Sequence, residues 1–173
     1  MLFHDEVNTI EELVEKLSDF DQDFGKIKTC VICFVFDKDN NLILNRRGPG
    51  ARDEVGMLQA IGGSVNNSDV DFRSAMMREL REEAGDKADI ELGNFLGAFL
   101  NPAKDKNTGE IINWIILAYV GRLVSGEVIN MEPDRCIGFE KMQMEDFDSS
   151  EISLSTYTFM QHMFCLLYTT PSP

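Results

Sequence analysis

Three glutamates crowd one side of a short helical segment, and this crowding constrains the chain more than any other feature. Glu79, Glu82 and Glu83 stand at positions i, i+3 and i+4, so on an α-helix they project into an arc of about 100°. Carboxylates this close repel one another unless a cation lies among them. Oxygen-only, multiply anionic clusters suit hard divalent ions such as Mg²⁺ or Mn²⁺. The alternative is a solvated acidic helix face, the usual meaning of clustered charge.

The same segment carries the signals of an amphipathic helix. One apolar face is predicted from residues that recur every four positions, namely Phe72, Met76, Leu80 and Ala84. Ser68 or Asp69 is expected to cap the helix, and Gly85 to end it in a left-handed conformation. Arg78 lies four residues before Glu82, close enough to orient that carboxylate. The helix can therefore pack on a core and still present its glutamates.

Together with the diglycine Gly62-Gly63, this segment resembles the Nudix box, whose pattern is G-x5-E-x7-R-E-U-x-E-E-x-G-U, where U is a bulky aliphatic residue. The half from Arg78 to Gly85 matches at every fixed position. In the other half the register requires one extra residue and places Asp69 where the family has glutamate. Asp86 replaces the final aliphatic residue, and Asn66 stands where many members carry another glutamate. The chain is identified as a MutT-like member of the Nudix hydrolase family with a variant box.

This resemblance implies an α/β fold, an α/β/α sandwich whose curved mixed β-sheet lies between the box helix and a C-terminal helix. It implies hydrolysis of a nucleoside diphosphate linked to another moiety, as in a nucleotide sugar, a dinucleotide or a nucleoside triphosphate. Mg²⁺ or Mn²⁺ is the implied cofactor, with the metal ligands Gly63, Glu79, Glu82 and Glu83. The ions would neutralise the pyrophosphate and activate water. Glu82 and Glu83 are then catalytic, and Arg78 orients the box.

A further glutamate is expected from outside the box. Nudix hydrolases often place one, distant in sequence, that faces the metal cluster as a ligand or general base. Glu132 is the candidate, because it ends a loop just before a predicted strand over residues 135–142. Glu127 and Glu140 are the alternatives, and an exposed loop acid without a catalytic role is the other interpretation.

Three arginines gather in a loop shortly before the box, which is notable in so acidic a chain. Arg46, Arg47 and Arg52 are candidate substrate-binding residues, because a guanidinium binds phosphate through two hydrogen bonds. Salt bridges to nearby carboxylates are an equally good interpretation. The resemblance favours a substrate role for Arg47, since the end of this strand faces the nucleotide in many Nudix enzymes.

The overall charge restricts the partners. The chain has 173 residues, a formal net charge of −14 and a pI near 4.4. Binding to nucleic acid or to an anionic membrane needs clustered Lys and Arg, so both are excluded and a small nucleotide-type substrate is expected. A metal must then bridge the acidic protein and the anionic substrate. No targeting or membrane-spanning segment is recognised, so the cytoplasm is the expected location. A homodimer remains open.

The length suits one domain with a sizeable core. We expect an accessory helix within residues 1–24, the Nudix domain over 25–168 and a disordered tail at 169–173. Strands are predicted over residues 28–36, 42–45, 57–61, 90–101, 111–124 and 135–142, and a helix over 153–168. The first strand is a nearly continuous apolar run, which is typical of a strand buried on both faces.

Two features inside these strands have a structural and a functional interpretation. Cys30-x-x-Cys33 looks like a redox or zinc motif, but strand residues three apart point to opposite faces, so reduced buried thiols are expected. Trp114 and Tyr119 lie in an apolar run and are expected in the core rather than stacked on a base.

Two other functions compete with hydrolysis of a linked nucleoside diphosphate. One is removal of oxidised nucleotides by cleavage of a triphosphate, which differs only in the shape of the pocket. The other is a catalytically silent Nudix-fold sensor of a nucleotide or sugar ligand, which the altered half of the box keeps open because a fold can outlive its chemistry.

Overall fold

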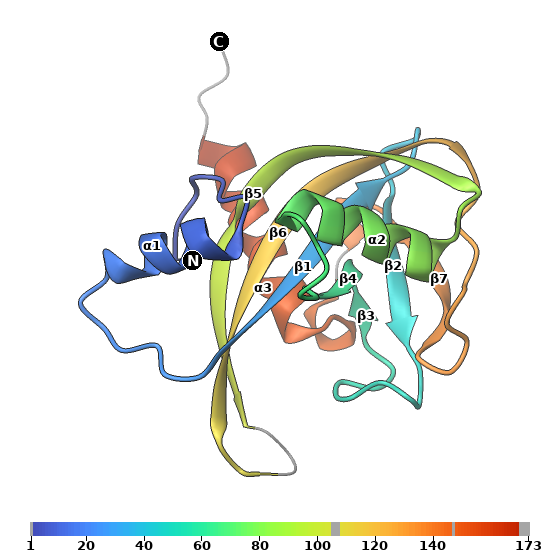
Figure 1. Ribbon diagram of the computed structural model, residues 1–173. Helices are drawn as coiled ribbons and strands as arrows, with labels where there is room; N and C mark the ends of the chain where they lie inside the picture. The colour runs from blue at the N-terminus through green and yellow to red at the C-terminus, as the bar shows by residue number, and fades with distance from the viewer. Residues whose placement is uncertain (1, 105–107, 147, 170–173) are drawn as a thin grey trace.

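The computed structural model describes residues 2–104, 108–146 and 148–169 of the chain, and side-chain surroundings as far as residue 162 (Figure 1). Its elements follow in the order α1 (Ile10–Ser18), β1 (Ile27–Phe36), β2 (Leu42–Arg47), β3 (Leu58–Gln59), β4 (Ile61–Ser64), α2 (Phe72–Ala84), β5 (Ala88–Lys104), β6 (Ile111–Gly126), β7 (Cys136–Met142) and α3 (Leu154–Thr169), with short 3-10 turns at Met144–Asp146 and Ser149–Glu151. Within these described ranges, no helix is long and apolar enough to cross a membrane.

The strands of the described residues form one seven-stranded mixed sheet. Its main path runs β3-β2-β1-β6-β5, while β4 pairs with β1 and β7 pairs with β2. The pair β1–β6 is parallel and the other pairs are antiparallel. The long β5–β6 hairpin bends as it crosses the molecule (Figure 1). The predicted curved mixed sheet is confirmed.

Strand β1 explains why the sheet needs cover on both faces. Val31, Cys33 and Val35 pack into one apolar core together with α1 and α2. Ile32 and Phe34, which point the other way, pack into a second core that includes Phe159 and Met160 of α3. Helix α2 lies in front of the sheet and α3 behind it (Figure 1). The expected α/β/α sandwich and the two-faced burial of this strand are both confirmed.

The N-terminal segment packs on the face that also carries α2. Leu13 and Leu17 of α1 are buried in the same core as Phe72. The Asn8 carbonyl accepts the N–H of Phe72 at 2.8 Å, so α1 is tied directly to the start of the box helix.

Some element boundaries differ from the predictions. The strand expected over 57–61 is split at Ala60 into β3 and β4, because the Ala60 N–H donates to the Thr156 hydroxyl of α3 at 2.9 Å. The loop expected over 102–110 begins later, since β5 runs on to Lys104. Helix α3 continues to Thr169, which was expected in the tail. The rest of that tail, 170–173, lies outside the described residues.

Candidate active site

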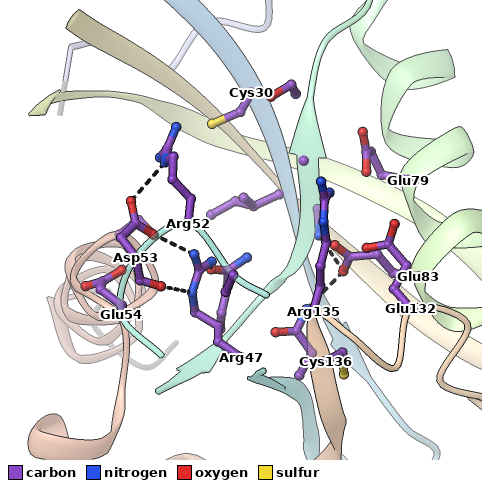
Figure 2. Close-up of a pocket in the computed structure, with 18 of the residues that line it drawn as sticks. Cys30, Arg47, Arg52, Asp53, Glu54, Glu79, Glu83, Glu132, Arg135 and Cys136 are labelled. Carbon is purple, nitrogen blue, oxygen red and sulfur yellow. Dashed lines mark hydrogen bonds and ion pairs between the residues drawn. The ribbon is translucent and has the colours of Figure 1, made fainter. Parts of the chain in front are cut away.

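A cavity of 560 Å³ opens between the box helix α2, strand β4 and the loops that precede β3 and β7. Figure 2 shows Glu79, Glu83 and Glu132 on the side of α2, and Arg47, Arg52 and Asp53 on the opposite side. Glu82 and Arg135 also line the cavity. The cavity therefore has an acidic wall and a wall that carries arginines.

The diglycine allows the acidic wall to lie directly on the sheet. Gly62 has a φ of +155°, and a Cβ there would collide with the Val31 carbonyl of the neighbouring strand. A Cβ on Gly63 would collide with the Glu79 carboxylate. A side chain at position 62 would therefore disrupt the pairing of β4 with β1, and one at position 63 would displace the Glu79 carboxylate.

The N-cap of helix α2 lies later in the chain than predicted. Asp71, rather than Ser68 or Asp69, is the N-cap, accepting the Ser74 N–H at 2.6 Å, while the Ser74 hydroxyl accepts the Asp71 N–H. Asp69 is already engaged elsewhere, which explains why the prediction was wrong. At the other end, Gly85 ends the helix with a positive φ of 84°, but its ψ of 159° differs from the expected left-handed helical conformation.

Asp69 is one of several acceptors that hold Arg78. The Arg78 guanidinium donates to both Asp69 carboxylate oxygens at 2.9 and 2.8 Å, and to the Ser64 carbonyl at 2.9 Å. It also donates to Glu79 at 2.7 Å and to Glu82 at 2.9 Å. The predicted Arg78–Glu82 pair is confirmed, and the aspartate in the variant half of the box completes the clamp. These bonds hold the pKa of Asp69 below its ordinary range.

Two glutamates of α2, Glu83 and Glu79, have raised pKa values. Burial raises the pKa of Glu83 to about 8, and the charges of Glu79 and Glu132 act in the same direction. The Gly62 N–H and the Asn45 side-chain amide donate to Glu83 at 3.3 and 2.9 Å and oppose the shift. Burial also raises the pKa of Glu79, although the Arg78 guanidinium acts against it.

These residues suit a hard divalent cation. Among the residues that the structure describes, no three His, Cys, Asp or Glu side chains converge closely enough to hold a metal ion as they lie. Glu79, Glu82, Glu83, Glu132 and Gly63 nevertheless line the same cavity. The raised pKa values of Glu79 and Glu83 show that these two carboxylates would gain from an added cation. Oxygen donors of this kind are those that Mg²⁺ and Mn²⁺ prefer.

The candidate general bases lie in different places. Glu132 lines the cavity beside Glu83 (Figure 2). Glu140 instead accepts hydrogen bonds from Arg46 at the outer side of β2 and β7. Neither Glu140 nor Glu127 lines this cavity. Of the three glutamates considered, Glu132 is the one that the fold brings to the box.

The three sequence-predicted arginines are also separated by the fold. Arg46 lies outside the cavity, in ion pairs with Glu140 and with Glu151 at 3.0 Å, and donates to the Gly56 carbonyl at 2.6 Å. Arg47 and Arg46 are neighbours in β2, so their side chains point to opposite faces of the sheet. For Arg46 the structure therefore favours the salt-bridge interpretation over substrate binding.

Arg47 and Arg52 line the cavity but are already held there. Arg47 donates to the Asp53 carboxylate at 2.6 Å and carbonyl at 2.8 Å, and to the Gln59 side chain. Arg52 donates to the other Asp53 oxygen at 3.0 Å, and its guanidinium lies 4.5 Å from the Trp114 ring centroid. Asp53 thus joins both arginines (Figure 2). Trp114 belongs to the core as expected, yet it also lines the cavity.

Arg135 is the cavity residue that sequence reasoning missed. The Glu132 carbonyl accepts the N–H of Arg135 at 2.9 Å and that of Cys136 at 2.8 Å, and this tight turn brings both charged side chains to the cavity. Within the described part of the chain, the Arg135 guanidinium forms no ion pair with a carboxylate. The sequence did carry one signal for this residue. Arg135 lies three positions after Glu132, and a turn can place two such residues on the same side.

The cysteines behave as structural thiols. Cys30, Cys33 and Cys136 are free, and burial raises the pKa of Cys30 to about 12. Strand positions three apart point to opposite faces of the sheet, so Cys33 lies in the core while Cys30 lies at the cavity wall. Cys33 is buried as expected, whereas Cys30 is only partly buried. The side chain of Cys165 lies outside the described surroundings.

The chain is similar to known NUDIX and MutT proteins. The family model of the NUDIX domain matches residues 26–163. A MutT NUDIX hydrolase from Burkholderia pseudomallei is similar with a TM-score of 0.62 and 22% identity, covering 79% of this chain and 98% of that one. A MutT protein from Methanosarcina mazei Go1 gives 0.61 and 16%, covering 86% and 100%. The NUDIX domain of Shewanella oneidensis NrtR, complexed with ADP ribose, gives 0.62 and 15%, covering 89% and 97%. No curated protein sequence matches significantly.

Proposed function

Because the chain belongs to the Nudix family and is a Nudix hydrolase acting on phosphoric anhydride bonds, we propose that it is a metal-dependent pyrophosphohydrolase. Its substrate is a nucleoside diphosphate linked to another moiety. The observation that carries this proposal is that five glutamates and four arginines line one 560 Å³ cavity. Carboxylates alone would repel a pyrophosphate, whereas carboxylates that hold cations, facing arginines, can bind it.

The cofactor is Mg²⁺ or Mn²⁺, held by Glu79, Glu82, Glu83 and Gly63. When bound, the ions neutralise the pyrophosphate and make the attacked phosphorus more electrophilic. The crowded, partly desolvated carboxylates around Glu83 support this assignment, because they lack a sufficient counter-charge.

The side chains of this chain divide the remaining tasks. Arg78 holds Glu79 and Glu82 in place through the hydrogen bonds already described, so it acts as a positioning residue. Glu132, beside Glu83, accepts the proton of the attacking water. Arg135 binds a phosphate oxygen of the substrate, because its guanidinium is not committed to a carboxylate. Arg47 and Arg52 shape the opposite wall and contribute positive charge there.

The substrate belongs to the nucleotides. The Shewanella domain of similar fold was solved with ADP ribose, which is a nucleoside diphosphate joined to a sugar. Hydrolysis at the pyrophosphate would give a nucleoside monophosphate and the phosphorylated second moiety. A triphosphate substrate would give a monophosphate and pyrophosphate instead.

A substrate panel tests this proposal. The protein is incubated with nucleotide sugars, dinucleotides and nucleoside triphosphates, each with Mg²⁺, with Mn²⁺ and with a chelator, and the products are separated by chromatography. We expect turnover of at least one class, and loss of that turnover with the chelator. Metal-independent turnover, or binding of a nucleotide without turnover in any arm, would refute it. The second result would favour the silent sensor.

We also propose that the protein is cytoplasmic, and its oligomeric state can be tested directly. A cytoplasmic location agrees with the free thiols of Cys30, Cys33 and Cys136, because reducing compartments keep cysteines unpaired. We propose no nucleic-acid partner, given the net charge of −14. Sedimentation of the purified protein would decide between a monomer and a homodimer.

A further inference from the structure

A second cavity adjoins the catalytic one on the side of the N-terminal segment. It measures 680 Å³, and Ser64, Asn66 and Trp114 line both cavities. A ligand bound against the box can therefore extend past these three residues without leaving the protein surface.

The outer wall of this second cavity comes from outside the domain matched by the family model. Thr9, Ile10 and Glu11, at the start of α1, face Lys28 and Thr29 of β1 across it. The wall is fixed in position, since α1 is anchored by its buried leucines and by the backbone hydrogen bond between residues 8 and 72. The N-terminal segment thus contributes to the shape of the cavity.

The lining of the second cavity differs chemically from that of the first. It is rich in hydroxyl and amide groups, from Thr9, Thr29, Ser64, Asn66 and Asn67. Its carboxylates (Glu11, Asp69 and Asp71) outnumber its one cation, Lys28. A further phosphate would be repelled there, whereas a neutral group with many hydroxyls would find donors and acceptors on several sides.

A nucleobase suits this cavity less well than a sugar. Trp114, its only large planar side chain other than Phe72 among the lining residues, is just 9% exposed. The Arg52 guanidinium lies 4.5 Å from the centroid of that ring and Lys28 Nζ lies 5.3 Å from it. A nucleobase would therefore have to compete with two cations for a largely covered indole ring.

We propose that the second cavity binds the sugar of a nucleotide sugar whose pyrophosphate lies in the first cavity. This inference rests on the proposed function and narrows it to one substrate class. The phosphates then meet the glutamates and arginines, and the sugar hydroxyls meet the threonine, serine and asparagine side chains around α1.

The kinetic test uses Asn67→Tyr, which adds bulk to the second cavity from an exposed turn, and Asn94→Tyr, an exposed control on β5 that lines neither cavity. The substrates are ADP-ribose and ATP. We expect Asn67→Tyr to raise KM for ADP-ribose about tenfold, with kcat/KM for ATP unchanged. Asn94→Tyr should leave both substrates unaffected. Equal losses on both substrates, or no loss on ADP-ribose, would overturn the inference.

A binding test separates this inference from the hydrolase proposal. Trp114 is the one tryptophan of the chain, so its fluorescence reports occupancy without any turnover. We expect ribose 5-phosphate to change this fluorescence in the wild type, and Asn67→Tyr to weaken its binding about tenfold. If wild-type protein hydrolyses only triphosphates and ribose 5-phosphate causes no change, the sugar site is refuted while the hydrolase proposal stands.

Discussion

Two arginines that line the catalytic cavity, Arg78 and Arg135, are engaged in opposite ways. On the helix side, Arg78 is saturated: it donates to Asp69, Glu79, Glu82 and a backbone carbonyl. On the side of the loop before β7, Arg135 reaches the same cavity without an ion pair to any carboxylate of the described residues. A guanidinium whose donors are all used can only position its neighbours, whereas an uncommitted one can bind a ligand. Arg78 is therefore assigned a positioning role and Arg135 a substrate-binding role.

Removing the negative charge of the α2 glutamates should have the largest effect on activity. Glu82→Gln combined with Glu83→Gln deletes two of the proposed metal ligands while keeping their volume. We expect kcat to fall by about 1,000-fold or more, since metal-ion stabilisation contributes several kcal/mol to such reactions. Steady-state turnover at saturating Mg²⁺ measures this. Retention of metal-dependent turnover would contradict the assignment of the site.

Arg78→Lys tests the positioning role with the charge retained. Lysine cannot donate to four acceptors in the planar arrangement of a guanidinium, so Glu79 and Glu82 should lose their fixed orientation. We expect kcat to fall about 100-fold and KM to change little, because a 1 Å misplacement of catalytic groups has an effect of this order. A rise in KM at constant kcat would instead place Arg78 among the substrate-binding residues.

Arg135→Ala tests the substrate-binding role proposed for the arginine beside Glu132. We expect KM to rise about tenfold with a smaller change in kcat, which corresponds to the loss of one charge-assisted hydrogen bond. Arg135→Lys should recover part of the affinity, because the positive charge remains. The matched control is Arg81→Ala, an exposed arginine of α2 that does not line the cavity. Equal effects of both alanine variants would show that only general charge matters.

Asp37 supplies a contrast from outside the cavity, where ionic contacts should affect stability alone. Burial disfavours its charge, but hydrogen bonds from Lys141 at 2.8 Å, from Asn41 and from the Asp39 N–H outweigh this and hold its pKa well below the ordinary value. A lowered folded-state pKa gives stability that is present above about pH 4 and is lost as the pH falls further. Asp37→Asn should therefore lower the free energy of unfolding by about 2 kcal/mol at pH 7, and by less at pH 3.

Urea unfolding at the two pH values measures this last effect. Turnover of the folded Asp37→Asn variant at pH 7 should match that of the wild type. A destabilisation independent of pH would show that packing, rather than ionisation, is what Asp37 contributes.

Periodic features of the sequence predicted the fold well. The four-residue repeat from Phe72 to Ala84 predicted the buried face of α2, and the continuous apolar run around Val31 predicted a strand covered on both sides. The cap of α2 was predicted incorrectly. Ser68, Asp69 and Asp71 are all chemically able to cap a helix, and the choice depended on Asp69 being engaged by Arg78.

Local spacing was enough to predict the family and the three glutamates of α2, because glutamates one turn apart on one helix share a face in any fold. The rest of the cavity lining depended on the tertiary structure. That structure turned Arg46 outward to Glu140, tied Arg47 to Asp53, and brought Arg135 and Glu132 to the box from a distant loop. Contacts within one helix follow from its period, whereas contacts between distant segments depend on how strands pair and loops turn, which no short stretch of sequence encodes.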